Sequence, residues 1–164
     1  MRDLERQPIG WIERAPASAI GRAVSSASPD AVFAVLADHV RWSEWFPNVR
    51  RVEVMGPAAG VGARRRVIIP GATFEEEFIV WEPGVRWSFT GTACRPGVVR
   101  SLVEDCRLEA TPDGGTAISY GMYFAPAPAV APFVRLGVGG LRRNLSKAMG
   151  NLASRAEALP ASDA

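Results

Sequence analysis

Hydrophobic and polar residues change their spacing along this chain of 164 residues. Over Ala19–Ala27 they alternate weakly, which predicts a first strand. Ser28 followed by Pro29 then predicts the start of a helix, because a serine side chain caps a helix and proline fits its first turn. A second short helix is expected over Arg41–Phe46, since Pro47 cannot continue it.

From residue 49 onward, short alternating segments are separated by turns rich in glycine and proline. Such a succession is typical of an antiparallel meander, in which each strand pairs with the next one along the chain. The expected strands cover Val49–Met55, Ala63–Ile69, Thr73–Trp81, Val85–Thr92, Val98–Ala110 and Thr116–Phe124.

The end of the chain predicts one long helix over Phe133–Leu159, with apolar residues at helical spacing on one side. The order of elements predicts an α+β fold. A curved antiparallel sheet of six to seven strands surrounds the C-terminal helix, and two short helices follow the first strand. One helix cannot fill so large a curved sheet, so a cavity is expected between them. We expect an N-terminal arm over residues 1–16, a single domain over 17–159 and a disordered tail over 160–164.

Charge and cysteine content exclude several classes of function. The net charge of +2 is too balanced to indicate a nucleic acid or an anionic membrane as partner. No segment is long and apolar enough to span a bilayer, and the first ten residues lack the apolar core of a signal peptide, so we expect a cytoplasmic protein. Strand pairing would place Cys94 and Cys106 roughly 26 Å apart, so two free thiols are expected.

Histidine chemistry is not expected, because His39 is the only histidine. A histidine metal cluster or a Ser-His-Asp triad would need more partners than the chain offers. We expect His39 to be a solvated residue between two helices, and we expect no metal and no cofactor.

Several stretches resemble the START-like, Bet v 1-like (SRPBCC) superfamily, in particular its bacterial polyketide cyclase/dehydrase group. These stretches are ASPDAVFAVLADHVRWSEWFPNVRRVEV at 27–54, GVGARRRV at 60–67, FEEEFIVWEPGVRWSF at 74–89, the Gly-Gly-Thr hairpin at 114–116 and the C-terminal helix. The resemblance implies the helix-grip fold. The group includes aromatase/cyclases as well as lipid and quinone carriers, so the resemblance implies a fold more firmly than an activity.

The aromatic residues Trp42, Trp45 and Phe46 lie within five positions. The resemblance places them where the short helices, the sheet and the long helix meet, as an aromatic plug. This agrees with the large area that aromatic side chains bury, which a helix of four residues needs. The alternative is that Trp45 or Phe46 lines a ligand cavity.

The hairpin at Pro83 and Gly84 sets the register of two strands. A two-residue loop would pair Glu82 with Val85, Val80 with Trp87 and Phe78 with Phe89. The more apolar parity then faces inward. Together with the neighbouring strands and the long helix, it predicts a cavity lined by Phe74, Phe78, Val80, Trp87, Phe89, Leu102, Met122, Phe133, Gly137 and Leu141.

The same parity turns a few polar groups inward, and these are the catalytic candidates. Arg65 would lie near Glu76, which would lie opposite a glycine. The pair either sits in water at the rim of the sheet or faces inward as a polar anchor, since buried charges persist only when paired. Glu104 would share an inward face with Arg100. Tyr120 would either contact a ligand carbonyl or reach a backbone carbonyl in the core.

The glycines at the start of the long helix, among them Gly137, leave room beside the sheet or mark a frayed helix start. Three functions are compatible with the sequence. We favour binding of a hydrophobic small molecule of lipid, polyketide or isoprenoid type. The alternatives are a polyketide cyclase/dehydrase that uses Arg65, Glu76, Glu104 and Tyr120, and a protein-interaction module. A homodimer is left open.

Overall fold

The computed structural model describes residues 1–159, apart from the side chain of Arg135. The predicted tail at 160–164 therefore lies outside the described residues. The strands are β1 (Arg2–Asp3), β2 (Ala17–Ser25), β3 (Arg51–Val54), β4 (Arg64–Ile69), β5 (Ala72–Glu82), β6 (Arg86–Arg95), β7 (Val99–Ala110) and β8 (Thr116–Pro126). The helices are α1 (Pro29–Ala37), α2 (Trp42–Trp45) and α3 (Val134–Glu157), with short 3₁₀ helices η1 (Ile9–Arg14), η2 (His39–Arg41) and η3 (Ala131–Phe133).

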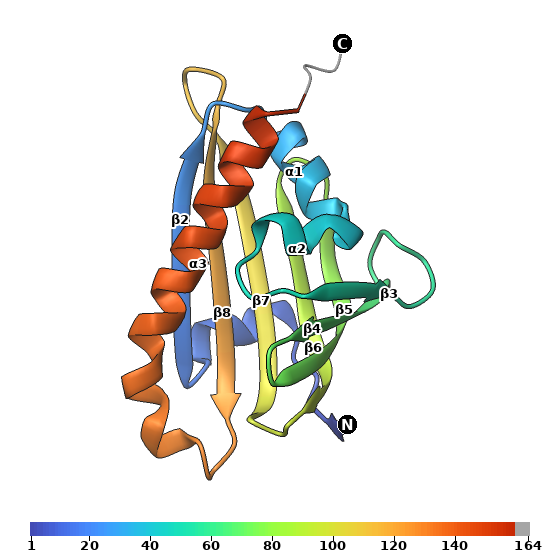
Figure 1. Ribbon diagram of the computed structural model, residues 1–164, viewed down its shortest axis with the longest axis vertical. Helices are drawn as coiled ribbons and strands as arrows, with labels where there is room; N and C mark the ends of the chain where they lie inside the picture. The colour runs from blue at the N-terminus through green and yellow to red at the C-terminus, as the bar shows by residue number, and fades with distance from the viewer. Residues whose placement is uncertain (160–164) are drawn as a thin grey trace.

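The strands form one antiparallel sheet in the order β2-β8-β7-β6-β5-β4-β3, with β1 paired to β6 off this path. From β3 to β8 each strand pairs with its neighbour in sequence, as predicted for a meander. Figure 1 shows the curved sheet with α3 running along its inner face and with α1 and α2 closing one end. The α+β helix-grip fold with a curved sheet around a long helix is confirmed. Seven strands lie on the main path of the sheet, within the predicted six to seven, and the two-residue strand β1 is an eighth that was not predicted.

The start of α1 follows from its first residues. The Ser28 hydroxyl accepts a hydrogen bond from the amide of Ala31 at 3.3 Å, and Pro29 occupies the first turn. The apolar side of α1 is buried. The chain then turns through η2 into α2, which ends at Phe46 before Pro47.

The β5–β6 hairpin differs from its predicted register. Its loop contains three residues, because Glu82 pairs with Arg86 rather than with Val85. A bulge between Phe78 and Val80 restores the predicted pairing of Phe78 with Phe89. Val80 pairs with Ser88 instead of Trp87, and the predicted pairing at this end of the hairpin is wrong.

Helix α3 packs most closely against the edge strand β2. A Cβ at Gly21 would lie 2.4 Å from the backbone of Leu145, so only glycine allows this approach. Leu145, Met149 and Leu152 are buried in the main core on this side. The first turns of α3 lie beyond β2 in Figure 1, and Phe133, Leu136 and Gly137 are exposed there.

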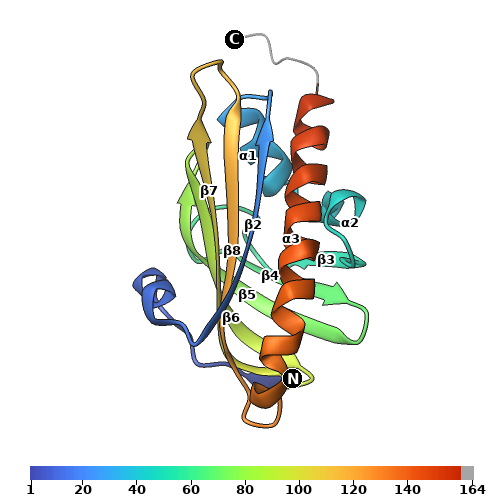
Figure 2. The ribbon, with the colours of Figure 1, turned by 90° about the vertical axis from the view of Figure 1, so that its left-hand side faces the viewer.

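The N-terminal arm is ordered and is part of the sheet. The amide of Leu4 donates to the Thr92 carbonyl, and the amide of Glu5 donates to the Arg100 carbonyl, both at 2.9 Å. These bonds lie where β6 and β7 no longer pair with each other. Figure 2 shows η1 on the side of the sheet opposite to α3, where Trp11 packs on Val103 and Ala125.

Cys94 and Cys106 are both buried and unpaired, as expected from their separation along the strands. Over residues 1–159, every helix is too short or too polar to cross a bilayer.

Candidate functional site

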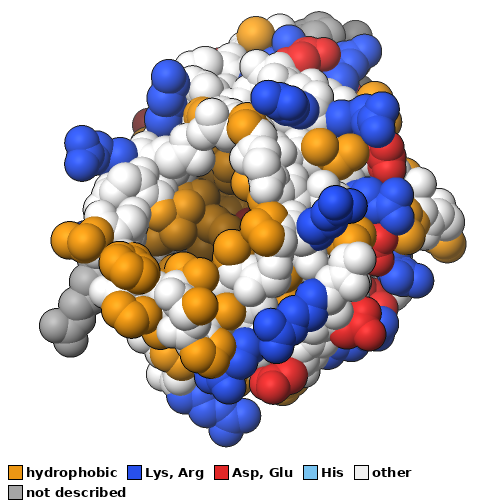
Figure 3. All heavy atoms as spheres, turned by 60° about the horizontal axis from the view of Figure 1, so that its bottom comes forward, with side chains coloured by type: hydrophobic (Ala, Val, Ile, Leu, Met, Phe, Trp, Pro, Cys, Tyr) orange, Lys and Arg blue, Asp and Glu red, His pale blue; other side chains and the backbone are white. Residues whose placement is uncertain are grey.

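A cavity of about 150 Å³ lies between the sheet, α3 and the loop after α2. It opens at the end of the molecule that faces the viewer in Figure 3, where hydrophobic side chains line its walls. The wall consists of Trp42, Phe46, Pro47, Asn48, Val49, Arg65, Val67, Ile69, Phe74, Glu76, Phe89, Leu102, Glu104, Met122, Leu141, Asn144 and Leu145. It is mainly apolar, and three ionisable residues are part of it.

The aromatic residues of α2 act in both of the ways considered from the sequence. Trp42 and Trp45 are buried, with ring centres 4.8 Å apart, and they belong to the main core. Trp42 and Phe46 also form part of the cavity wall, whereas Trp45 does not. The plug therefore closes one end of the interior and leaves the other end hollow.

Arg65 and Glu76 form a buried ion pair on the cavity wall. They are register partners on β4 and β5, and the Arg65 Nε donates to Glu76 Oε2 at 2.7 Å. Only 1 % of Arg65 and 4 % of Glu76 is exposed, so the interpretation that they sit in water at the rim is wrong. Burial raises the pKa of Glu76, while the adjacent guanidinium favours its ionised form.

One nitrogen of the Arg65 guanidinium has no hydrogen-bond partner among the described residues. Its carbon lies 3.9 Å from the ring centre of Trp42 and 4.7 Å from that of Trp87, so the ring faces stabilise its charge. Nε binds Glu76 and Nη1 contacts His39, but Nη2 is buried without a hydrogen-bond partner among the described residues. A buried donor left unpaired costs roughly 1–3 kcal/mol, which a ligand oxygen would recover.

His39 is buried, which corrects the expectation of a solvated residue. Only 3 % of it is exposed, because its ring stacks on Phe78 with centres 5.2 Å apart. Its Nε2 lies 3.1 Å from the Ala58 carbonyl, and its Nδ1 lies 3.2 Å from Arg65 Nη1. These partners fit a neutral ring with the proton on Nε2. Burial and the charge of Arg65 lower the pKa of His39 to about 4.

Glu104 and Tyr120 form a second buried polar pair on β7 and β8. The Tyr120 hydroxyl donates to Glu104 Oε2 and not to the backbone carbonyl that was one of its two predicted partners. Burial, reinforced by the charge of Glu76, raises the pKa of Glu104 to about 8. Burial also raises the pKa of Tyr120. At neutral pH, Glu104 is therefore mainly an uncharged carboxylic acid that can donate a hydrogen bond as well as accept one.

Five of the predicted lining residues form part of the wall: Phe74, Phe89, Leu102, Met122 and Leu141. Phe78 and Trp87 point inward but pack against each other, with ring centres 5.0 Å apart, in the filled part of the core. Their predicted place on the cavity wall is wrong, because α1, α2 and their aromatic side chains fill that end.

The other residues predicted to line the cavity are absent from its wall because the course of the backbone differs from the prediction. Val80 follows the bulge in β5 and is absent from the wall. Phe133 and Gly137 are exposed, since α3 begins beyond the edge of the sheet. Among the catalytic candidates, Arg65, Glu76 and Glu104 are on the wall, while Tyr120 reaches it only through Glu104. Arg100 is exposed beside an irregularity in β7 and does not share the face of Glu104.

Asn48 and Asn144 are wall residues that the sequence pattern did not indicate. The Asn48 amide donates to Asn144 Oδ1 at 3.3 Å and links the loop after α2 to α3 over the cavity. Asn48 has a φ of 68°, a conformation that asparagine adopts more readily than most residues. Its place directly after Pro47 is the one local signal that could have pointed to this turn.

The wall is close to neutral overall. With Glu76 ionised, its charge offsets that of Arg65, and Glu104 is uncharged. The cavity thus offers hydrogen-bond donors to a guest without demanding that the guest be charged. Within residues 1–159, no three His, Cys, Asp or Glu side chains are placed to hold a metal ion.

Residues 19–157 match the protein family described as polyketide cyclase / dehydrase and lipid transport. The chain is also 32 % identical over 124 residues to the uncharacterized protein Rv2574 of Mycobacterium tuberculosis, covering 74 % of each chain.

Several solved structures share the fold. The Zhui aromatase/cyclase of a Streptomyces species superposes with a TM-score of 0.71 at 16 % identity, covering 86 % of this chain and 93 % of that one. A START superfamily protein of Mycobacterium smegmatis gives a TM-score of 0.68 at 12 % identity, covering 85 % of this chain and 97 % of that one. At these identities the likeness establishes the fold alone.

Proposed function

Because the chain belongs to the polyketide cyclase / dehydrase and lipid transport family, we propose that its cavity binds a small, mainly apolar molecule that carries an acceptor oxygen. A pocket with apolar walls and a few convergent polar groups is the usual form of a small-molecule site. Its size suits a guest, or the buried part of a guest, of about one six-membered ring, since cavities near this volume hold benzene.

The unpaired Nη2 of Arg65 is the observation that carries this proposal. Its two neighbouring nitrogens are held by Glu76 and His39, which fixes the guanidinium in one orientation. A carbonyl or hydroxyl oxygen of the guest would accept from Nη2. A hydrocarbon of the same shape would leave this donor unpaired and would therefore bind more weakly.

Native mass spectrometry of the purified protein tests whether the cavity retains a guest. We expect added mass that an organic solvent removes, and we expect Leu141→Trp to lose it because the larger ring fills the cavity. Ser154→Trp is the matched control, since Ser154 lies on the same helix but is exposed and does not line the cavity. Equal occupancy in both variants would argue against a guest in this cavity.

Cyclase/dehydrase chemistry is the second candidate, and the charge states of two carboxyl groups favour it. Glu104 and Glu76 lie on the wall of one cavity, and burial raises the pKa of both, but only Glu76 has a guanidinium bonded to it that favours the charged form. Groups with different proton affinities in one site are the requirement for general acid and base catalysis. Glu104 would protonate a ligand oxygen, as carbonyl addition and loss of water both require.

Turnover of a short poly-β-ketone thioester tests this candidate. We expect Glu104→Gln to abolish product formation while guest binding persists, because glutamine keeps an acceptor for Tyr120 but cannot release a proton. Glu109→Gln serves as the control, since Glu109 is exposed on the same strand. If the wild type bound a guest but did not turn over the thioester, the catalytic proposal would be excluded and the binding proposal would stand.

A further inference from the structure

The end of the molecule at the cavity mouth carries an exposed apolar edge. Phe133 is 64 % exposed and Leu136 is 84 % exposed, at the junction of η3 and α3. The preceding loop adds exposed proline and alanine side chains at 128, 129, 131 and 132. Figure 3 shows hydrophobic side chains gathered on one side of the opening. We call residues 128–136, without the side chain of Arg135, the docking rim.

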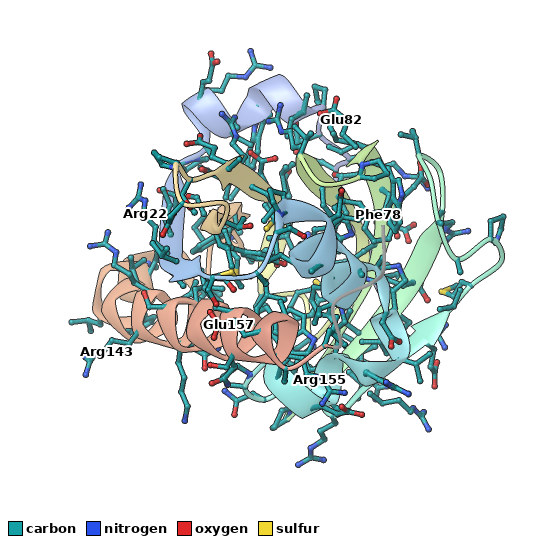
Figure 4. The ribbon with its side chains drawn as sticks, turned by 90° about the horizontal axis from the view of Figure 1, so that it is seen from above. Arg22, Phe78, Glu82, Arg143, Arg155 and Glu157 are labelled. Atoms are coloured by element: carbon teal, nitrogen blue, oxygen red, sulfur yellow. The ribbon has the colours of Figure 1, made fainter. Side chains whose placement is uncertain are left out.

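Positive charge accompanies this rim along α3. No Asp or Glu occurs between residues 114 and 156. Arg143 and Lys147 are exposed and follow Leu136 by seven and eleven residues, so they project from the same side of the helix. Figure 4 shows Arg143 pointing away from the sheet. The balanced net charge of the whole chain therefore conceals a basic surface next to an apolar one.

We propose that the docking rim binds the surface of an anionic lipid bilayer, with the cavity mouth turned toward the lipid. At a rise of about 1.5 Å per residue, Arg143 lies about 10 Å from Leu136 along the helix. Apolar residues of peripheral proteins enter about 5–10 Å into the boundary between headgroups and acyl chains. With Leu136 inserted to that depth, Arg143 reaches the level of the anionic headgroups. Lys147 lies about 16 Å from Leu136, just outside the headgroups and within a Debye length of them.

This proposal modifies the expectation drawn from net charge, which counted the chain as a whole. It does not depend on the identity of the cavity guest. A second copy of the chain fits the surface less well, because a two-fold interface formed by this stretch would set its cations against the same stretch of the other copy. Among the described residues of this stretch, no carboxylate is available to offset them.

Sedimentation with vesicles tests the proposal directly. We expect the protein to sediment with vesicles of phosphatidylcholine mixed with phosphatidylglycerol, more strongly than with phosphatidylcholine alone, and to dissociate at high salt. Phe133→Ser combined with Leu136→Ser should weaken binding at least about tenfold, because two apolar side chains no longer enter the lipid. Arg143→Gln and Lys147→Gln should each weaken it roughly fivefold.

Val24→Ser is the matched control, since Val24 is 69 % exposed but lies near the other end of β2. It should bind as the wild type does. Circular dichroism should confirm that every variant remains folded. Equal binding by the rim variant and the control would overturn the proposal. Failure of the wild-type protein to bind vesicles would also overturn it. In that case, loss of a dimer or loss of binding to an acidic protein in Leu136→Ser would identify the partner of the rim instead.

Discussion

Arg65 and Glu76 face each other across β4 and β5 and bond at 2.7 Å inside the protein, with the guanidinium packed on aromatic rings. Each of the two charges depends on the other, because both side chains are almost completely buried. His39 contacts Nη1 of the guanidinium, and Arg65 is also one of the residues of the cavity wall. The pair therefore belongs both to the structural core and to the wall of the proposed binding site.

Removing one member of this pair should destabilise the protein strongly. Arg65→Met leaves the Glu76 carboxylate buried without a partner, so we expect the free energy of unfolding to fall by about 3–5 kcal/mol. Urea unfolding measures this change. Arg66→Met should cost much less, because Arg66 pairs with Glu53 and Glu75 at the surface, where solvent screens the charges.

The double variant Arg65→Met, Glu76→Leu should recover at least about 2 kcal/mol of that loss, since two apolar side chains need no charge partner. If the double variant were as unstable as Arg65→Met, the pair would stabilise the protein through packing that methionine and leucine do not reproduce.

Glu104 should make stability fall as the pH rises. Its pKa is raised from 4.5 to about 8 in the folded protein, so the folded state holds the proton more tightly than the unfolded chain. The resulting stabilisation is complete below pH 4.5 and is lost as the pH rises through about 8. Glu104→Gln should remove this dependence, worth no more than about 5 kcal/mol, in unfolding measured across that range. Parallel pH profiles for both proteins would contradict the buried acid.

His39 should make the stability of the protein fall as the pH decreases, opposite to the effect of Glu104. Its pKa is lowered from 6.5 to about 4, so the unfolded chain takes up the proton first. The stability it contributes is present above pH 6.5 and is lost as the pH falls toward 4. His39→Gln should flatten this fall, which amounts to about 3 kcal/mol at most. If the variant lost as much stability as the wild type over this pH range, groups other than His39 would cause the loss.

The N-terminal arm should contribute to stability although it lies outside the main core. Trp11 is buried on the outer face against Val103 and Ala125. Trp11→Ala should lower the free energy of unfolding by about 3 kcal/mol, as for other buried aromatic residues. Arg14→Ala, at an exposed position of η1, should change it by no more than about 0.5 kcal/mol. If both substitutions changed the free energy of unfolding equally, the packing of Trp11 on the sheet would not contribute to stability.

The alternation of side chains was enough to predict the centre of the sheet. Arg65 pairs with Glu76, and the two share the inner face because side chains alternate with a period of two. Phe78 pairs with Phe89 as predicted, but only because the bulge after Phe78 offsets the longer loop. Ser28 and Pro29 likewise indicated α1 from local chemistry alone. These features depend on neighbouring residues, which a sequence displays directly.

Features that depend on distant segments could not be predicted. The place of Val80 depends on a bulge, and nothing in the local pattern distinguishes a two-residue from a three-residue loop at Pro83 and Gly84. His39 is buried because Phe78 and the Ala58 carbonyl meet it from other parts of the chain. Phe133 and Gly137 have the correct helical spacing, but α3 starts beyond the sheet that would have covered them.

We propose above that the cavity binds an apolar guest through a hydrogen bond from Arg65. Calorimetric titration with acetophenone and with α-methylstyrene tests it, because the two molecules share a shape and differ in one carbonyl oxygen. We predict that the wild type binds acetophenone at least about tenfold more tightly, and that this preference disappears in the double variant Arg65→Met, Glu76→Leu. Equal affinities in the wild type, or binding that Leu141→Trp leaves unchanged, would contradict the account.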